Sequence, residues 1–165
     1  MDQCGKHGDT PLSIAARNRY LEHVKYLVEK GANVNVIGYF DFTPIAHAAN
    51  NGDLKMVKYL LEHGADINYN EDYTPLMAAS AVGQIHIVEY LIEQGADVNL
   101  ADKKHGRSPL YVATEHGKQY VVEYLVEHGA DVNQKNKYGD YPHACALHNT
   151  YTDIARYLES KGAYK

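Results

Sequence analysis

Between Thr74 and Asn99, apolar and polar positions follow a pattern that predicts two short helices joined by a tight turn. Thr74 and Pro75 suit the start of the first helix, because threonine caps a first turn and proline fits the first helical position. Gly83 suits its end, since glycine tolerates positive φ. A second apolar stripe with helical period follows, before Gly95: Ile85, Ile87, Val88, Leu91 and Ile92. Neither helix is long enough to be stable alone in water, so each must pack against a neighbour.

The same pattern recurs along the chain. The pair that opens each first helix lies at spacings of 33, 31, 34 and 33 residues: Thr10-Pro11, Thr43-Pro44, Thr74-Pro75, Ser108-Pro109 and Tyr141-Pro142. The glycine that ends each second helix has the same spacings: Gly31, Gly64, Gly95, Gly129 and Gly162. A fixed period that carries a helix–turn–helix is typical of stacked repeats. Beyond the central pair we expect helices near Pro11–Asn18, Leu21–Glu29, Pro44–Asn51, Leu54–His63, Pro109–His116, Tyr120–His128, Pro142–Asn149 and Thr152–Lys161.

The motif TPLxxAAxxG followed by VVxxLLxxGADVN resembles the ankyrin repeat, and the likeness covers nearly all residues from Thr10 to Ala163. It implies an all-α ankyrin-repeat solenoid of five helix-turn-helix repeats with β-hairpin loops, as a single domain over residues 1–165. The repeats are expected at about 5–37, 38–70, 71–101, 102–135 and 136–165. The connecting loops differ in length, which favours a natural protein over an idealised consensus design.

Some positions depart from the motif. Arg19 and Thr150 stand where Gly83 does. Because Thr150 is β-branched and suits positive φ poorly, we expect Asn149 to take that conformation instead.

The terminal repeats carry polar residues at positions that are apolar in the middle. The Leu76 position is held by His143 in repeat 5, and the Ile92 position by Glu159. At the Ile87 position the middle repeats have apolar residues, whereas we assign polar residues to it in the outer two repeats, His23 and Asp153. A solenoid needs polar outer faces on its terminal repeats, so we expect five repeats and no missing core.

The bulk properties exclude several classes of function. A net charge of −5 gives no concentrated basic surface, so no nucleic acid is expected as a partner. No apolar run approaches the length of a membrane span, and no membrane association is expected. Cys4 and Cys145 lie four repeats apart, beyond disulfide reach, and two free thiols favour a reducing compartment. We therefore expect a cytoplasmic monomer, with delivery into a host cell as an open alternative.

The ten histidines do not form a recognisable site. No HExxH, CxxC or phosphate-binding glycine-rich motif is present, so no metal, no cofactor and no enzymatic activity are expected. His63 and His128 share a helix C-terminal position, where histidine interacts favourably with the helix dipole. His47 holds a variable position that we expect to be half-exposed in a groove.

Two rows of equivalent residues have mainly structural explanations. Five tyrosines share one phase of the second helices, where we expect rings packed between repeats with wet hydroxyls, a second binding surface being the alternative: Tyr26, Tyr59, Tyr90, Tyr124 and Tyr157. Four asparagines end the GA(D/N)(V/I)N segments, where the side chain is expected to hydrogen-bond a turn: Asn35, Asn68, Asn99 and Asn133. The resemblance also implies that these asparagines can be hydroxylated in a host that has the enzyme.

The resemblance places partner binding on the hairpin tips and on the ends of the first helices. The residues at these positions are Tyr39, Phe40, Phe42, Asn50, Asn51, Tyr73, Ala81, Val82, Lys104, Arg107, Glu115, His116 and Tyr138. Exposed aromatic residues on a rigid edge are typical of interface hot spots, so the strongest expectation concerns Tyr39, Phe40 and Phe42. The alternative is that these rings fold back onto the neighbouring, shorter tip and cover it.

These observations predict a non-catalytic module that binds a protein partner through its groove and tips, as an adaptor, inhibitor or effector. Fold alone does not determine function, so the binding role is inferred from the resemblance and from the groove, which is aromatic and acidic in repeats 2 and 3 and basic in repeats 4 and 5. The alternative is a sensor of small molecules or anionic metabolites that uses the basic tips of repeats 4 and 5, at Lys103, Lys104, Arg107 and Lys137.

Overall fold

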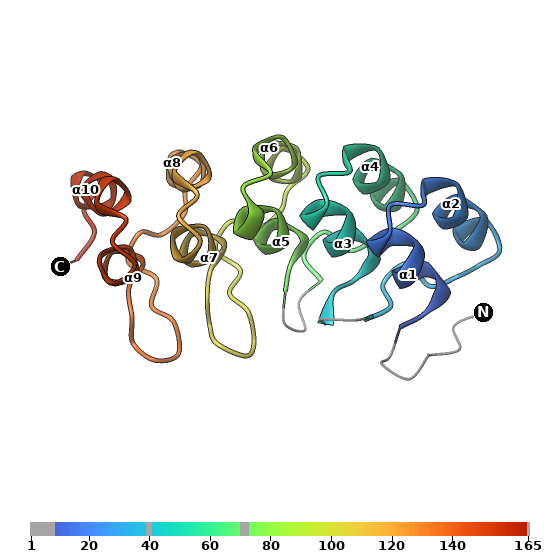
Figure 1. The fold of residues 1–165 in the computed structure, drawn as a ribbon, viewed down its shortest axis with the longest axis horizontal. Helices are drawn as coiled ribbons and strands as arrows, with labels where there is room; N and C mark the ends of the chain where they lie inside the picture. The colour runs from blue at the N-terminus through green and yellow to red at the C-terminus, as the bar shows by residue number, and fades with distance from the viewer. Residues whose placement is uncertain (1–8, 39–40, 70–72, 165) are drawn as a thin grey trace.

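The computed structural model describes residues 9–38, 41–69 and 73–164. Within these residues the chain forms ten helices in five pairs: α1 (Pro11–Arg17) with α2 (Leu21–Glu29), α3 (Pro44–Asn50) with α4 (Leu54–Glu62), α5 (Pro75–Val82) with α6 (Ile85–Glu93), α7 (Pro109–Glu115) with α8 (Gln119–Glu127), and α9 (Pro142–His148) with α10 (Thr152–Ser160). The first helices form one row and the second helices another, with the long loops on the far side of the first row (Figure 1). This arrangement confirms the predicted all-α solenoid. The described residues contain no strand, so the expected hairpin loops reverse direction through turns.

The first helices begin as their sequence predicts. In four repeats the hydroxyl before the proline accepts a hydrogen bond from the backbone N–H three residues on: Thr10 from Ser13, Thr43 from Ala46, Thr74 from Met77 and Ser108 from Tyr111, at 3.1–3.3 Å. Repeat 5 starts at Tyr141, which makes no such side-chain bond. The hydroxyl caps explain why helices of only seven or eight residues have defined starts.

The turn inside repeat 5 corrects one expectation. Thr150 has φ 63°, as Arg19 has φ 64° in repeat 1, whereas Asn149 has φ −88°. The prediction that Asn149 takes the positive φ is therefore wrong. The N–H groups of Thr150 and Tyr151 bond the Leu147 and Ala146 carbonyls at 3.1 and 2.9 Å, the pattern that Gly117 also uses. The turn geometry of the repeat thus prevails over the conformational preference of Thr150. The left-handed conformation costs this residue about 1–2 kcal/mol.

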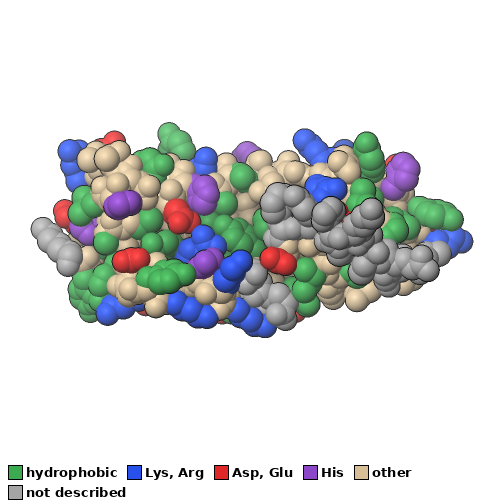
Figure 2. Space-filling view, turned by 60° about the horizontal axis from the view of Figure 1, so that its bottom comes forward, with side chains coloured by type: hydrophobic (Ala, Val, Ile, Leu, Met, Phe, Trp, Pro, Cys, Tyr) green, Lys and Arg blue, Asp and Glu red, His purple; other side chains and the backbone are tan. Residues whose placement is uncertain are grey.

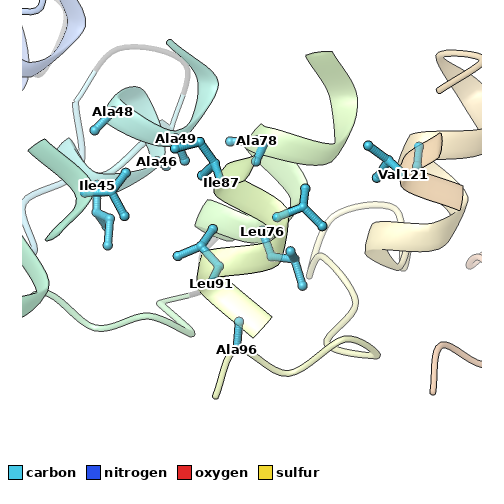
Figure 3. Close-up of a cluster of buried hydrophobic side chains, with 14 of the residues drawn as sticks. Ile45, Ala46, Ala48, Ala49, Leu76, Ala78, Ile87, Leu91, Ala96 and Val121 are labelled. Atoms are coloured by element: carbon cyan, nitrogen blue, oxygen red, sulfur yellow. The ribbon is translucent and has the colours of Figure 1, made fainter. Parts of the chain in front are cut away.

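The core lies between the two rows of helices and continues from one repeat to the next. Leu76 and Leu91 are at most 1% exposed and pack in the layer that Ile45, Ala49 and Val121 extend into the neighbouring repeats (Figure 3). Each first helix packs on the first helices of the adjacent repeats. Burial is therefore shared between neighbours, which explains how helices this short are stable.

The asparagine row links successive repeats. Asn99 donates its side-chain amide to the Gly129 carbonyl at 3.0 Å and accepts from the Asp131 N–H at 2.8 Å, both in the turn of the next repeat. Asn35 and Asn133 make the corresponding pair of bonds at their own junctions, and Asn68 accepts from the Asp97 N–H at 2.9 Å. The predicted turn-bonding role is confirmed. We call this line of four residues the asparagine edge.

The tyrosine row packs against the preceding repeat. The Tyr59 hydroxyl lies 3.4 Å from the Lys25 carbonyl, and the Tyr157 hydroxyl lies 3.3 Å from the Glu123 carbonyl. Tyr26, which precedes the other four, is 58% exposed. His63 Nδ1 lies 2.8 Å from the Tyr59 carbonyl at the end of α4, and its ring stacks on that tyrosine. His128 and Tyr124 repeat this arrangement, so the helix-terminal explanation of these histidines is confirmed.

The first repeat leaves apolar residues uncovered. Ile14 is 40% exposed, although His47 and Val112, at the same position of later repeats, are buried. The expectation that His47 is half-exposed is therefore wrong: His47 is 4% exposed, and its ring lies 5.2 Å from the Phe42 ring, centroid to centroid. An apolar hollow forms around Ile14, lined by Pro11, Ala15, Tyr20, His23, Tyr26 and Leu27.

In the last repeat, polar side chains stand at positions that are apolar in the middle repeats. Buried His143 places Nε2 3.1 Å from Glu159 Oε1, so the polar pair satisfies itself. The assignment of Asp153 to the Ile87 position is wrong: the spacing of 33 residues from Val121 leads to Ile154, which is 3% exposed. Asp153 lies one position earlier, in solvent.

Candidate functional site

The tips before α7 and α9 are tight turns braced by a polar side chain. In the first of them the Asp102 N–H donates to the Arg107 carbonyl at 2.9 Å, and the Asp102 carboxylate accepts from the backbone N–H groups of His105 and Arg107. In the next tip the Asn136 side chain accepts from the N–H groups of Tyr138 and Asp140, each at 2.9 Å. These bonds hold the tip side chains in fixed positions, which is what a pre-organised binding surface requires.

A row of stacked side chains joins the tips of repeats 2, 3 and 4. The Phe42 ring stacks on Tyr73, with ring centroids 5.4 Å apart. The Arg107 guanidinium lies 5.6 Å from the centroid of the Tyr73 ring, within the range of a cation–π interaction. Arg107 also places Nε 2.9 Å from Asp102 Oδ2 and Nη1 3.1 Å from Glu115 Oε2. We call Phe42, Tyr73, Asp102, Arg107 and Glu115 the Tyr73 cluster.

Burial and charge act together on this cluster. Burial tends to raise the pKa of Asp102, but hydrogen bonds from the His105 N–H and from Arg107 outweigh it and hold that pKa below its usual value. Burial tends to lower the pKa of Arg107, and Asp102 more than offsets this. Burial raises the pKa of the Tyr73 hydroxyl, with Arg107 opposing. Asp102 and Arg107 are therefore a stable ion pair, and Tyr73 is a neutral aromatic residue.

A cavity of about 340 Å³ opens beside the cluster, and we call it the tip pocket. It is lined by Asp41, Phe42, Tyr73, Asp102, Lys104, His105 and Arg107. Figure 2 shows acidic, basic and histidine side chains interleaved with hydrophobic ones over the half of this surface that the later repeats form. Such a surface combines apolar contact with several possible hydrogen bonds.

A second cavity of about 520 Å³ lies between α7 and α9, and we call it the Tyr111 pocket. It is lined by Tyr111, Glu115, Asp140, Ala144, Cys145, His148 and Asn149. Tyr111 and Cys145 are each 7% exposed and form the floor. Burial raises the pKa of the Cys145 thiol, which favours its neutral form on the pocket floor. Glu115 lines this pocket and pairs with Arg107, which lines the tip pocket, so the ion pair connects the two cavities.

The structure brings together five of the residues proposed from the sequence: Phe42, Tyr73, Lys104, Arg107 and Glu115. Tyr39 and Phe40 lie outside the described residues. Phe42 is half-buried against Tyr73, so its expected exposure is wrong and the fold-back alternative describes this ring.

The other proposed residues lie apart from the cluster. Asn51 donates to the Arg17 carbonyl at 2.9 Å, and His116 Nδ1 lies 3.0 Å from the Val112 carbonyl, so both serve the ends of first helices. Asn50 and Ala81 are half-buried at the ends of α3 and α5. Val82 and Tyr138 are 42% and 70% exposed, and the Tyr138 hydroxyl lies 3.0 Å from His105 Nδ1.

Sequence reasoning missed two residues that shape this surface. Asp102 braces a tip, and its signal is an aspartate that opens the longest interrepeat loop, since aspartate side chains often bond backbone N–H groups of a following turn. Tyr111 forms a pocket floor, and its signal is a large aromatic residue at a position held elsewhere by Ser13, Ala46, Met77 and Ala144. Both signals require the repeats to be aligned position by position.

The stacked helix pairs define the chain as an α-solenoid, and comparison with known families identifies which kind. Residues 36–102 and 99–165 each match the model of ankyrin repeats in three copies, and residues 7–39 match that of the single ankyrin repeat. The chain therefore belongs to the ankyrin-repeat family. A search of curated proteins gave no significant match.

Two further searches concern the part of the chain that the structure describes. None of its helices combines the length and the apolar character needed to cross a bilayer. Residues 9–38, 41–69 and 73–164 also contain no group of three or more His, Cys, Asp or Glu side chains placed to hold a metal ion.

Proposed function

We propose that this chain is a non-catalytic module that binds a protein partner through the surface formed by its tips and first helices. Ankyrin repeats are generally protein-protein interaction modules and are typically non-catalytic. The proposed binding surface comprises the Tyr73 cluster, the tip pocket and the Tyr111 pocket, with Val82, Lys104 and Tyr138 as exposed neighbours. Side chains on loops that a rigid scaffold positions are where binding function usually resides.

The observation that carries this proposal is the position of Tyr73 between Phe42 and Arg107. Tyrosine and arginine are enriched among residues that dominate binding energy. Here three successive tips hold the tyrosine ring, while the Asp102 and Glu115 carboxylates hold the guanidinium. A partner would therefore meet side chains already in place and would spend little binding free energy on ordering them.

The anionic-metabolite alternative has weaker support. Arg107 is bound by two carboxylates, so an anion would have to compete with both. The Lys137 ammonium donates to the Lys103 backbone carbonyl. The basic tips thus hold fewer available cations than the sequence suggests. A titration with anionic metabolites that leaves the melting temperature unchanged is the result we expect.

The first test is partner capture from the native cell, followed by affinity measurement with the purified partner. Tyr73→Ala should weaken binding by at least about tenfold, since tyrosine hot spots contribute about 2 kcal/mol or more. Tyr90→Ala is the matched control, because Tyr90 is a half-buried tyrosine of the same repeat, with Lys58 5.0 Å from its ring centroid, on the row of second helices.

Val82→Glu provides an independent variant, because Val82 is exposed and its replacement should not disturb the core. It should also weaken binding while leaving the melting temperature unchanged. Full affinity in both Tyr73→Ala and Val82→Glu, or an equal loss in Tyr90→Ala, would show that the partner binds elsewhere. The monomeric state remains a prediction, which sedimentation tests. The cytoplasmic location also remains a prediction, which imaging of a tagged chain tests.

A further inference from the structure

The Tyr111 pocket exists because repeat 5 presents a small residue next to a large one of repeat 4. Tyr111 projects from α7 toward α9, where Ala144 and Cys145 leave room above its ring. Ala144 is exposed at the rim, whereas Tyr111 and Cys145 are almost completely buried. The pocket is therefore open at one side and lined below by an aromatic ring, a thiol and a methyl group, which together favour the apolar stem of a long side chain.

The rim of this pocket carries negative charge. Glu115 from α7 and Asp140 from the last tip both line it. After burial, the field of these two carboxylates is among the causes that raise the pKa of Tyr111 and of Cys145, which places both charges close to the floor. Asp140 also accepts from the Asn136 side-chain amide at 3.2 Å, which holds its carboxylate in place.

The nearby cation does not neutralise the rim. Arg107 reaches Glu115 through Nη1, but its Nε is bound to buried Asp102. Arg107 is therefore shared between Asp102 and Glu115, whereas Asp140 is held by the Asn136 amide, so this one guanidinium does not offset both rim carboxylates. A carboxylate or phosphate would be repelled here, whereas a cationic group would be attracted.

We propose that the Tyr111 pocket receives the side chain of a lysine or arginine from the protein partner. The aliphatic stem packs on Ala144 and Cys145, the cationic head lies over the Tyr111 ring, and Glu115 and Asp140 accept its hydrogen bonds. This inference rests on the proposed function, since it names the chemistry that the partner must present. It predicts a partner segment with a basic residue next to one that contacts Tyr73, because Glu115 borders both sites.

The test uses a small probe and needs no partner. N-acetyl-L-arginine N-methylamide is titrated into the full isotope-labelled chain and followed by NMR, with the citrulline analogue as the neutral probe of equal shape. The arginine probe should shift the backbone signals of Ala144, Cys145 and Asn149 in a saturable way, with millimolar affinity typical of one side chain. The citrulline probe should bind at least about threefold more weakly, the difference that one modest charge contact makes.

Three variants and one control separate charge from shape. Asp140→Asn and Glu115→Gln keep the size of the side chains and should each weaken the arginine probe about threefold or more. Ala144→Leu fills the rim without changing charge and should abolish the shifts. Asp153→Asn is the control, because Asp153 lies in the same repeat, paired with Arg156 and outside the pocket, and should bind the probe as the parent chain does.

Equal binding of the arginine and citrulline probes, or unchanged binding in all three pocket variants, would overturn this inference. The outcome is distinguishable from failure of the proposed function. If Tyr73→Ala abolishes partner binding but Ala144→Leu and Asp140→Asn do not change it, the proposed function stands. Only the proposal that a basic side chain occupies the pocket would then be wrong. Melting curves of every variant show whether a lost shift reflects lost folding, and a folded Ala144→Leu chain that still binds the probe contradicts the assignment by itself.

Discussion

Contacts between successive repeats lie along two edges of the solenoid, and the two edges use different kinds of contact. At the asparagine edge, one kind of contact is repeated, because an asparagine of each repeat bonds the turn of the next. At the edge of the tips, the three junctions within the described residues all differ: a ring stack between repeats 2 and 3, a cation over a ring between repeats 3 and 4, and backbone and side-chain bonds between repeats 4 and 5.

This difference separates the part of the chain that maintains the stack from the part that is available for recognition. A repeated contact can only set the spacing of neighbours, since it is the same everywhere. A contact that occurs at one junction gives that junction a surface unlike the others, and a partner can bind that surface specifically. The variable edge is also where the loops differ in length and where both cavities border on tip residues. The following predictions address the shared core first and then each edge.

The largest effect is expected in the apolar layer that both edges share. Leu91→Ala removes a fully buried side chain and should lower the free energy of unfolding by about 2–5 kcal/mol. Because repeats contact only their neighbours, the denaturant transition should also become less cooperative. Urea unfolding followed by circular dichroism measures both, and a change within error would place Leu91 outside the inter-repeat core.

At the variable edge, Asp102→Asn should lower the free energy of unfolding by about 1.5–3 kcal/mol at neutral pH, since it weakens hydrogen bonds to a charged group. The folded pKa of Asp102 is lowered from 3.8, so its stabilisation is present above that value and is lost as pH falls through the folded pKa. The difference between the parent chain and the variant should therefore shrink in acid. Urea titrations at several pH values test this, and a difference independent of pH would contradict it.

At the asparagine edge, Asn99→Ala should lower the free energy of unfolding by about 1–2 kcal/mol, because two hydrogen bonds between repeats are lost. Asn35→Ala should have a similar effect, since it makes the same pair of bonds at 3.2 and 2.8 Å. Gln94→Ala, exposed at the end of α6, serves as the control. Widely different values for the two asparagines would show that the edge is not uniform.

The smallest effect is expected for Phe42→Leu, which keeps apolar bulk but removes the stack on Tyr73. Aromatic pairs contribute about 0.5–1.5 kcal/mol beyond their buried area. The melting temperature should fall slightly, and partner affinity should fall with it, because Tyr73 loses one of its supports. An unchanged melting temperature would return Phe42 to the role of an exposed binding residue.

The periodic part of this molecule could be predicted from its sequence, and the unique part could not. The bounds of α2 were predicted to the residue, because its apolar stripe and the glycine that follows it, Gly31, recur in the other repeats. The exposure of His47 was predicted wrongly because its burial depends on contacts outside its own helix, such as that with the Phe42 ring. The pairing of Phe42 with Tyr73 depends on how two loops of unequal length meet, which no single repeat encodes. Thr150 shows the reverse case, in which repeat geometry prevails over a residue's own preference.

The unequal ends give the solenoid a preferred direction of extension. A helix pair grafted ahead of Pro11 would meet Ile14, Tyr20 and Tyr26 already apolar and exposed, so burying them would contribute stability at once. A helix pair grafted behind the last repeat would instead have to desolvate Glu159 and disturb its pairing with His143. A repeat can therefore be added before repeat 1 without changing its apolar residues, whereas addition after repeat 5 requires compensating substitutions.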